Sequence, residues 1–257
     1  MLETVGSIAC AVVTGIAERV RSQSIARSLA DLVGLLIAVI LLYQVYLFAW
    51  VLWYSVFNPG GSAYMREQAS QLAAQDPPVS IQYEWTPYEA ISPNLKKAVI
   101  AAEDARFTEH GGVEWEAIRK AWRYNERQEE AGHTRRRGGS TLTQQLAKNL
   151  FLSADRSYIR KGQELIITYM IEAIMSKQRI LELYLNVVEY GTGIFGAQAA
   201  ARHYFKVDAA HLSASQAARL AAILPNPRVY GKNMQSRYVL SRGRTISARM
   251  RSAVLPE

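Results

Sequence analysis

The chain has 257 residues, enough for one domain of ordinary size plus an appendage. Its formal net charge of +8 predicts a polyanionic partner: nucleic acid, anionic lipid headgroups or a phosphorylated substrate. Cys10 is the only cysteine, which excludes an intramolecular disulfide.

A long uncharged segment, residues 32–57, is dense in Leu, Ile, Val and aromatic residues. A bilayer core about 30 Å thick needs roughly 20 apolar residues in a helix, so this segment predicts a transmembrane helix. Trp50, Trp53 and Tyr54 cluster near its far end, as in an interfacial aromatic belt. The alternatives are a buried core helix, which rarely runs so long without charge, and a cleaved signal peptide, for which no cleavage pattern is clear.

The flanking charges predict the orientation of this helix. Arg19, Arg21 and Arg27 precede it, whereas the first basic residue on the other side is Arg66. Because positive charge stays inside, we expect residues 1–31 to be cytoplasmic and the chain after about residue 60 to lie outside. This topology argues against nucleic acid as the polyanion.

The remaining chain reads as a mainly α-helical domain. Residues 58–80 are polar and read as a juxtamembrane linker or an exposed helix, and residues 81–85 as a short strand. Helical periodicity and capping residues then predict a domain over residues 81–257. Its expected helices begin after Ser92 and cover residues 113–129, 141–151, 158–175 and 179–188 and a segment between Ser213 and Pro225.

Two adjacent acids, Glu103 and Asp104, end the first of these helices. One interpretation is a solvated helix end. The other is a carboxylate in a cleft, desolvated enough to act as a general base. Phe107 nearby reads as a packing residue, and His110 as a structural histidine rather than an acid or base.

A glycine pair precedes the next polar cluster, which contains Ser140, Gln145 and Lys148. A helix that begins after glycines offers free backbone N–H groups and a partial positive charge, a suitable site for phosphate. The alternative is a capped helix after a glycine turn, with Thr141 and Gln144 at capping-box spacing.

The third cluster is Arg160, Lys161 and Glu164, which share one helix face. Further basic residues precede it, namely Arg135, Arg136, Arg137, Lys148 and Arg156. Glu164 should therefore stay ionised, a poor proton acceptor that orients cations or holds a metal. A surface ion-pair cluster is the alternative. Glu103 lacks close cationic neighbours in sequence and is the better candidate base.

Together these clusters resemble the glycosyltransferase domain shared by class A penicillin-binding proteins and monofunctional peptidoglycan transglycosylases. Five patterns of that family occur in order between about residues 98 and 230. They are Glu103-Asp104-x-x-Phe107-x-x-His110-x-Gly112; Gly138-x-Ser140-Thr141-x-Thr143-Gln144-Gln145; Arg160-Lys161-x-x-Glu164; Lys177-x-x-Ile180-Leu181-Glu182-x-Tyr184-Leu185-Asn186; and Gly196 through Ala200 to Tyr204-Phe205.

The resemblance implies a lysozyme-like fold and the substrate lipid II, an undecaprenyl-pyrophosphoryl disaccharide-peptide. Because little chain follows the domain, the resemblance implies an enzyme of the monofunctional, single-span type. It also implies a location in the bacterial cytoplasmic membrane, where other wall synthases are possible partners. On this reading Glu103 is the general base, and Glu164 orients Arg160, Lys161 and Lys148, directly or through a divalent cation such as Mg²⁺ or Mn²⁺. Ser140 and Gln145 would position the substrate, and Asp104, also counted among the substrate-binding residues, would support Glu103 and nearby cations.

Two other classes of function fit parts of the sequence. A membrane-anchored lytic enzyme suits a single catalytic carboxylate but not the cationic cluster. A non-catalytic scaffold on anionic lipid or a division protein suits the basic charge but needs no Glu103. A nucleic-acid binder is a distant third, because aromatic residues are not interleaved along the basic segment.

Overall fold

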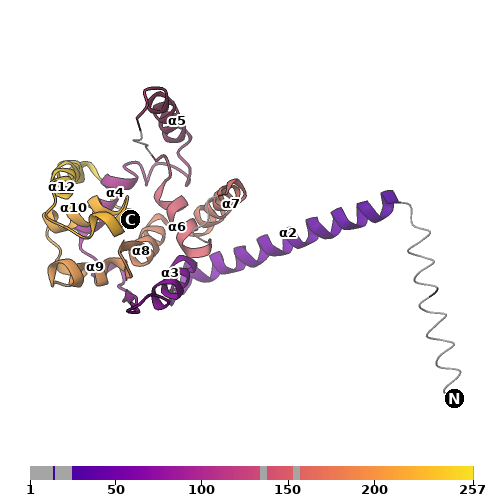
Figure 1. Ribbon diagram of the computed structural model, residues 1–257, viewed down its shortest axis with the longest axis horizontal. Helices are drawn as coiled ribbons and strands as arrows, with labels where there is room; N and C mark the ends of the chain where they lie inside the picture. The colour runs from indigo at the N-terminus through magenta and orange to yellow at the C-terminus, as the bar shows by residue number, and fades with distance from the viewer. Residues whose placement is uncertain (1–13, 15–24, 134–137, 153–156, 257) are drawn as a thin grey trace, which may run out of the picture. The chain divides into compact units, whose positions relative to one another are not determined.

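The computed structural model describes residues 14, 25–133, 138–152 and 157–256. The chain divides into two compact units, residues 1–49 and 50–257. Helix α2 (Ile25–Val56), indigo in Figure 1, runs through this division. Among the described residues, one segment is long and apolar enough to cross a membrane, the 28 residues Leu29–Val56. This segment is about 42 Å long at 1.5 Å per residue, which exceeds the thickness of a bilayer core.

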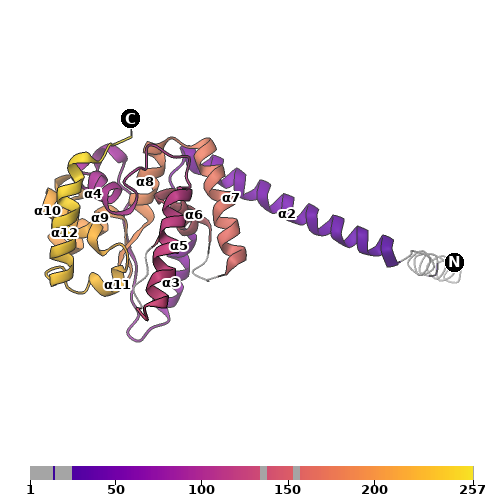
Figure 2. The ribbon, with the colours of Figure 1, turned by 90° about the horizontal axis from the view of Figure 1, so that it is seen from above.

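The second unit is mainly helical, as predicted, and Figure 2 shows its helices from a second direction. The α-helices that follow α2 are α3 (Ala63–Ala73), α4 (Pro93–Glu103), α5 (Trp115–Glu130), α6 (Leu142–Phe151), α7 (Tyr158–Ile174), α8 (Lys177–Val187), α9 (Gly196–Phe205), α10 (Ala214–Ile223), α11 (Pro227–Tyr230) and α12 (Arg237–Arg249). Short 3₁₀ turns occur at Tyr88–Ala90, Ala209–His211 and Met250–Ser252.

Three very short strands form a small sheet in the order β1-β3-β2. Strand β1 (Gln82–Tyr83) lies inside the predicted strand and pairs in parallel with β3 (Ile194–Phe195). Strand β2 (Glu189–Gly191) pairs antiparallel with β3.

Side-chain caps explain where most helices begin. Ser92 accepts from the backbone N–H of Asn94, with Pro93 at the first helical position of α4. The predicted capping box of Thr141 with Gln144 begins α6, and a second capping box, Ser213 with Gln216, begins α10.

The core forms two helical groups that meet at the end of α4. Helix α10 packs against α12 and α4, and Figures 1 and 2 both show these three helices together. Helix α6 packs against α7 and α8. Leu142, Leu146 and Leu150 of α6 are buried, as their spacing predicts. The polar side of α6 is therefore free to face a site.

Two segments differ from the sequence interpretation. Residues 58–80 contain the helix α3, as one of the two interpretations expected, but its Met65 and Leu72 are buried and it packs against α6, so it is neither fully exposed nor a free linker. Helix α12 was not predicted, because its sequence is rich in arginine and buries only Val239, Gly243 and Ile246.

We predict that Thr141→Ala destabilises the domain more than the matched change Ser213→Ala. Both remove a capping hydroxyl, typically worth about 1 kcal/mol. Thr141 is buried, and its hydroxyl also donates to the Gly112 carbonyl oxygen at 2.5 Å, whereas the Ser213 cap is exposed. Urea unfolding of both variants measures the difference, and equal losses would contradict the added role of the Gly112 contact.

Candidate active site

Glu103 is the last residue of α4, and its carboxylate meets Gln145 of α6. Gln145 Nε2 donates to Glu103 Oε2 at 2.9 Å, and Tyr184 Oη of α8 donates to Gln145 Oε1 at 3.0 Å. Because Tyr184 is fully buried, this chain of two hydrogen bonds fixes the orientation of the Gln145 amide. Two of the predicted site residues, far apart in sequence, are thereby brought into contact.

The environment of Glu103 suits a proton acceptor. Burial raises the pKa of its carboxyl above the ordinary glutamate value, and the neighbouring charge of Asp104 adds to this rise. The Gln145 hydrogen bond and the charges of Arg242 and Lys148 oppose it. A carboxylate that is costly to ionise but held by a donor and nearby cations can take a proton and return it.

Arg242 is a site residue that the sequence interpretation missed. It comes from α12, outside all five patterns, and its Nε is buried without a hydrogen-bond partner in the described part of the chain. The cationic neighbours that Glu103 lacks in sequence are therefore supplied in space by Arg242 and Lys148. No local signal distinguishes this arginine from the others of α12.

Asp104 occupies a different position from Glu103, although the two are adjacent. Its Oδ2 accepts from the backbone N–H of Leu142 at 3.0 Å, and both of its carboxylate oxygens lie within 3.1 Å of His110 Nε2. Since the Gly112 N–H donates to His110 Nδ1 at 3.1 Å, the His110 proton resides on Nε2 and faces Asp104. This geometry favours a positioning role for Asp104 over direct contact with substrate, and a structural role for His110.

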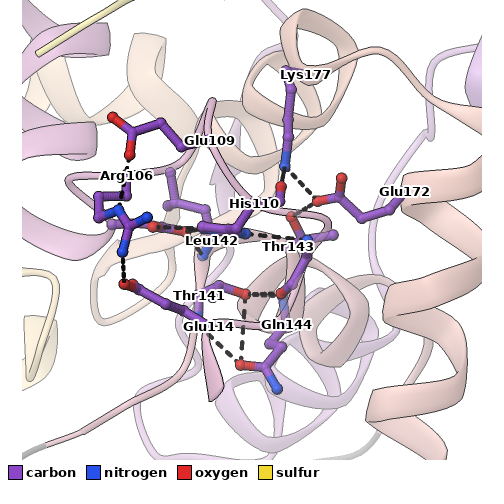
Figure 3. Close-up of polar contacts among 12 residues, drawn as sticks. Arg106, Glu109, His110, Glu114, Thr141, Leu142, Thr143, Gln144, Glu172 and Lys177 are labelled. Atoms are coloured by element: carbon purple, nitrogen blue, oxygen red, sulfur yellow. Dashed lines mark hydrogen bonds and ion pairs between the residues drawn. The ribbon is translucent and has the colours of Figure 1, made fainter. Parts of the chain in front are cut away.

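The loop after α4 is held by a second set of polar contacts, drawn in Figure 3. Lys177 Nζ donates to the His110 carbonyl oxygen at 2.7 Å and to Glu172 at 2.8 Å, and Thr143 donates to the same Glu172 oxygen at 2.5 Å. Gly112 completes the loop at φ +87°, where a Cβ would lie 2.6 Å from the Glu172 side chain. Lys177 of the fourth pattern is thus a structural residue.

The cationic cluster gathers around Glu164, which is buried on α7. Arg160 Nη1 bonds to one carboxylate oxygen at 3.1 Å, and Lys161 Nζ bonds to the other. Lys161 also donates to Ser140 Oγ at 3.2 Å. The shared face predicted for these three residues is present, and Ser140 joins it from the start of α6.

Lys148 connects this cluster electrostatically to Glu103. Burial lowers the pKa of its ammonium group, and the charges of Arg160 and Lys161 lower it further. The carboxylates of Glu164 and Glu103 both raise it. Lys148 is therefore a cation whose charge both acids stabilise. Arg135, Arg136, Arg137 and Arg156 lie outside the described residues.

Among the described residues, one group of side chains has the spacing of a metal site, and its carboxylates already have partners. Asp104, His110 and Glu114 bring ligand atoms within 4.8 Å of one another. However, Glu114 accepts from Arg106, and Asp104 is engaged by His110 and the Leu142 amide. Glu164 faces two cations, so its contacts favour direct orientation of Arg160 and Lys161.

Comparison with known proteins identifies the family. The transglycosylase family model matches residues 70–251. The chain belongs to this family. The resemblance based on the five patterns is confirmed, as are the lysozyme-like glycosyltransferase fold of the domain and its nature as a glycosyl-transferring enzyme.

Several curated relatives carry the name biosynthetic peptidoglycan transglycosylase. One from Bordetella pertussis is 56% identical over 230 residues, covering 90% of this chain and 95% of the relative. One from Bordetella avium is 57% identical over 236 residues, covering 92% and 98%. A relative from Janthinobacterium sp. is 53% identical over 220 residues, covering 86% and 94%.

We predict that Glu103→Gln stabilises the protein at neutral pH and that the gain disappears in acid. The folded protein holds the Glu103 proton more tightly than the unfolded chain, because burial raises this pKa. The ionised carboxylate therefore costs stability at neutral pH, and the cost vanishes below the ordinary glutamate range. Glutamine keeps an oxygen for the Gln145 donor.

Urea unfolding across a pH series measures this effect. The control is Glu116→Gln, a change to an exposed side chain of α5, which should leave the pH dependence nearly unaltered. If Glu103→Gln lowered stability at every pH, the ionised carboxylate would not be the strained form.

Proposed function

We propose that this protein is a peptidoglycan glycosyltransferase that polymerises lipid II into β-1,4-linked glycan strands. The observation that carries the proposal is the contrast between two acids that both stabilise the charge of Lys148. Glu103 has a raised pKa and is held by Gln145, whereas Glu164 is bonded to Arg160 and Lys161. Such a site combines a base with a cationic pocket for a pyrophosphate leaving group.

The proposed reaction proceeds with inversion at the anomeric carbon of the donor. Glu103 takes the proton from the acceptor 4-hydroxyl as its oxygen bonds to that carbon. The bond from the carbon to the pyrophosphate oxygen breaks, and undecaprenyl pyrophosphate leaves with the electron pair. Arg160, Lys161 and Lys148 stabilise the charge that develops on the leaving group.

The remaining predicted residues have supporting roles in this proposal. Gln145 orients Glu103, and Ser140 binds the donor beside Lys161. Asp104 fixes the loop that carries His110. Glu164 holds Arg160 and Lys161 in place without accepting the proton, because both of its oxygens are bonded to cations.

The membrane arrangement is part of the proposal. Residues 32–57 would anchor the chain in the bacterial cytoplasmic membrane, with residues 1–31 cytoplasmic and the glycosyltransferase domain outside. The long apolar segment of α2 and a substrate with a lipid tail support this arrangement. Other wall synthases would be partners on the same membrane face.

We expect Glu103→Gln to reduce lipid II polymerisation by about 10²–10⁴-fold, the usual contribution of a general base. Purified full-length protein in detergent would be assayed for glycan strands from lipid II. A near-wild-type rate would remove Glu103 from the base role. Shortening of preformed glycan by the wild type, without polymerisation, would instead indicate the lytic enzyme.

We expect Arg242→Gln to move the acid limb of the pH–rate profile to higher pH. Arg242 lowers the pKa of Glu103, so its removal raises that pKa, and a larger fraction of the base is protonated in mild acid. Arg244→Gln, a change to an exposed arginine on the same helix, serves as the control. A uniform loss of rate at all pH values would mean that Arg242 acts on folding rather than on the base.

A further inference from the structure

The last part of α2 belongs to the second compact unit, which begins at Trp50. The sequence has no charged residue from position 32 to position 57. The C-terminal end of a helix carries a partial negative charge, and its last four carbonyl groups have no partner within the helix. The end of α2 therefore needs hydrogen-bond donors and a cation from elsewhere in the chain.

Arg179, near the start of α8, supplies both, from an open position of the fourth family pattern. Its Nε donates to the Tyr54 carbonyl oxygen at 3.0 Å, and its Nη2 donates to the Phe57 carbonyl oxygen at 2.8 Å. Its Nη1 donates to Asn58 Oδ1 at 2.9 Å. All three nitrogens of one guanidinium group thus bond to the end of α2, which a lysine cannot reproduce.

Arg179 is itself held by neighbours in the domain. Its Nη1 also bonds to Glu182 Oε2 at 2.6 Å, and Glu182 Oε1 accepts from the Tyr88 backbone N–H at 3.0 Å. The guanidinium carbon lies 5.5 Å from the centre of the Trp85 ring. The side chains of Arg179 and Glu182 are only 13% and 15% exposed. Such a partly buried pair holds its geometry better than an ion pair on the surface.

Apolar side chains reinforce this junction. Val51 is fully buried, and the centre of the Tyr54 ring lies 5.9 Å from that of Phe151 at the end of α6. Helix α6 carries Gln145, and α8 carries Tyr184, whose hydroxyl donates to the Gln145 amide oxygen. The two helices that orient the proposed base are therefore the two that contact the end of α2.

We propose that Arg179 is a positioning residue that caps α2 and fixes the end of the membrane helix on α8 and α6. The proposal rests on the proposed function, because it takes α2 as the anchor and lipid II as the substrate. An anchored enzyme and a lipid-linked substrate share one bilayer, so the reacting sugars reach the site at a set depth. A rigid joint at the end of the anchor keeps Glu103 at that depth, whereas a joint that pivots lowers the fraction of productive encounters.

A spin label at residue 56 measures whether Arg179 holds the helix end. Val56 is 72% exposed and Cys10 is the only cysteine, so Val56→Cys in a Cys10→Ser background gives one labelled site. We expect Arg179→Gln to increase the mobility of this label in lipid vesicles. The matched control is Arg228→Gln, because Arg228 also donates through Nε and Nη2, but to side chains of α3 and β2. It should leave the label mobility unchanged.

Polymerisation in two media tests the consequence for the reaction. In vesicles that hold the full-length protein together with lipid II, we expect Arg179→Gln to lower kcat/KM about tenfold, as for the loss of one hydrogen bond to a charged group. In detergent micelles, which do not hold enzyme and substrate in a common plane, the loss should be less than about twofold. Arg179→Lys keeps the charge but not the planar fork, so it should recover only part of the vesicle rate.

Two results would overturn the proposal. Unchanged label mobility in Arg179→Gln would mean that other contacts hold the end of α2. An equal loss of rate in vesicles and micelles would mean that Arg179 acts on the fold or the chemistry rather than on the joint. If a melting curve shows that Arg179→Gln does not fold, Arg179→Lys gives the same two readouts. If wild type polymerises lipid II in neither medium, the proposed function fails, and the label mobility still decides whether Arg179 caps α2.

Discussion

The site depends on one buried carboxylate, that of Asp104, which joins the end of α4 to the start of α6. It accepts from the first backbone N–H of α6 and from His110, so it neutralises a helix N-terminus and fixes the intervening loop at once. Glu103 precedes Asp104 in sequence, and Gln145 lies one turn after Leu142 on α6. Joining Asp104 to Leu142 therefore brings Glu103 next to Gln145, whose amide donates to its carboxylate.

The second constraint is the separation of the two acids by their surroundings. Glu103 is desolvated and bonded to one amide donor, and its burial raises the pKa of its carboxyl. Glu164 is also buried but has a cation on each oxygen. The charge of Lys148 is stabilised by both acids. The same residue type is thus desolvated at one point of the site and paired with two cations at another.

Structural groups surround this chemistry and take no direct part in it. Lys177, Glu172 and Thr143 hold the His110 loop against α6 and α8, and Gly112 allows the turn that this packing requires. Burying so many polar groups is tolerated because each is hydrogen-bonded. Helix α5 differs in the opposite way, because its large apolar side chains are exposed. Its tryptophans do not join the core.

The sequence by itself determined whatever depends on neighbouring residues. The apolar run of α2, the caps at Ser92, Thr141 and Ser213, the leucine face of α6 and the shared face of Arg160 with Glu164 all follow from local spacing. The tertiary structure decided which distant groups meet. Arg242 reaches Glu103 only because α12 packs beside α4, and Asp104 turns away from Glu103 only because the amide of Leu142 is there to receive it. Such contacts depend on how the helices pack against one another. The periodicity of the sequence does not indicate which side chains of different helices will meet.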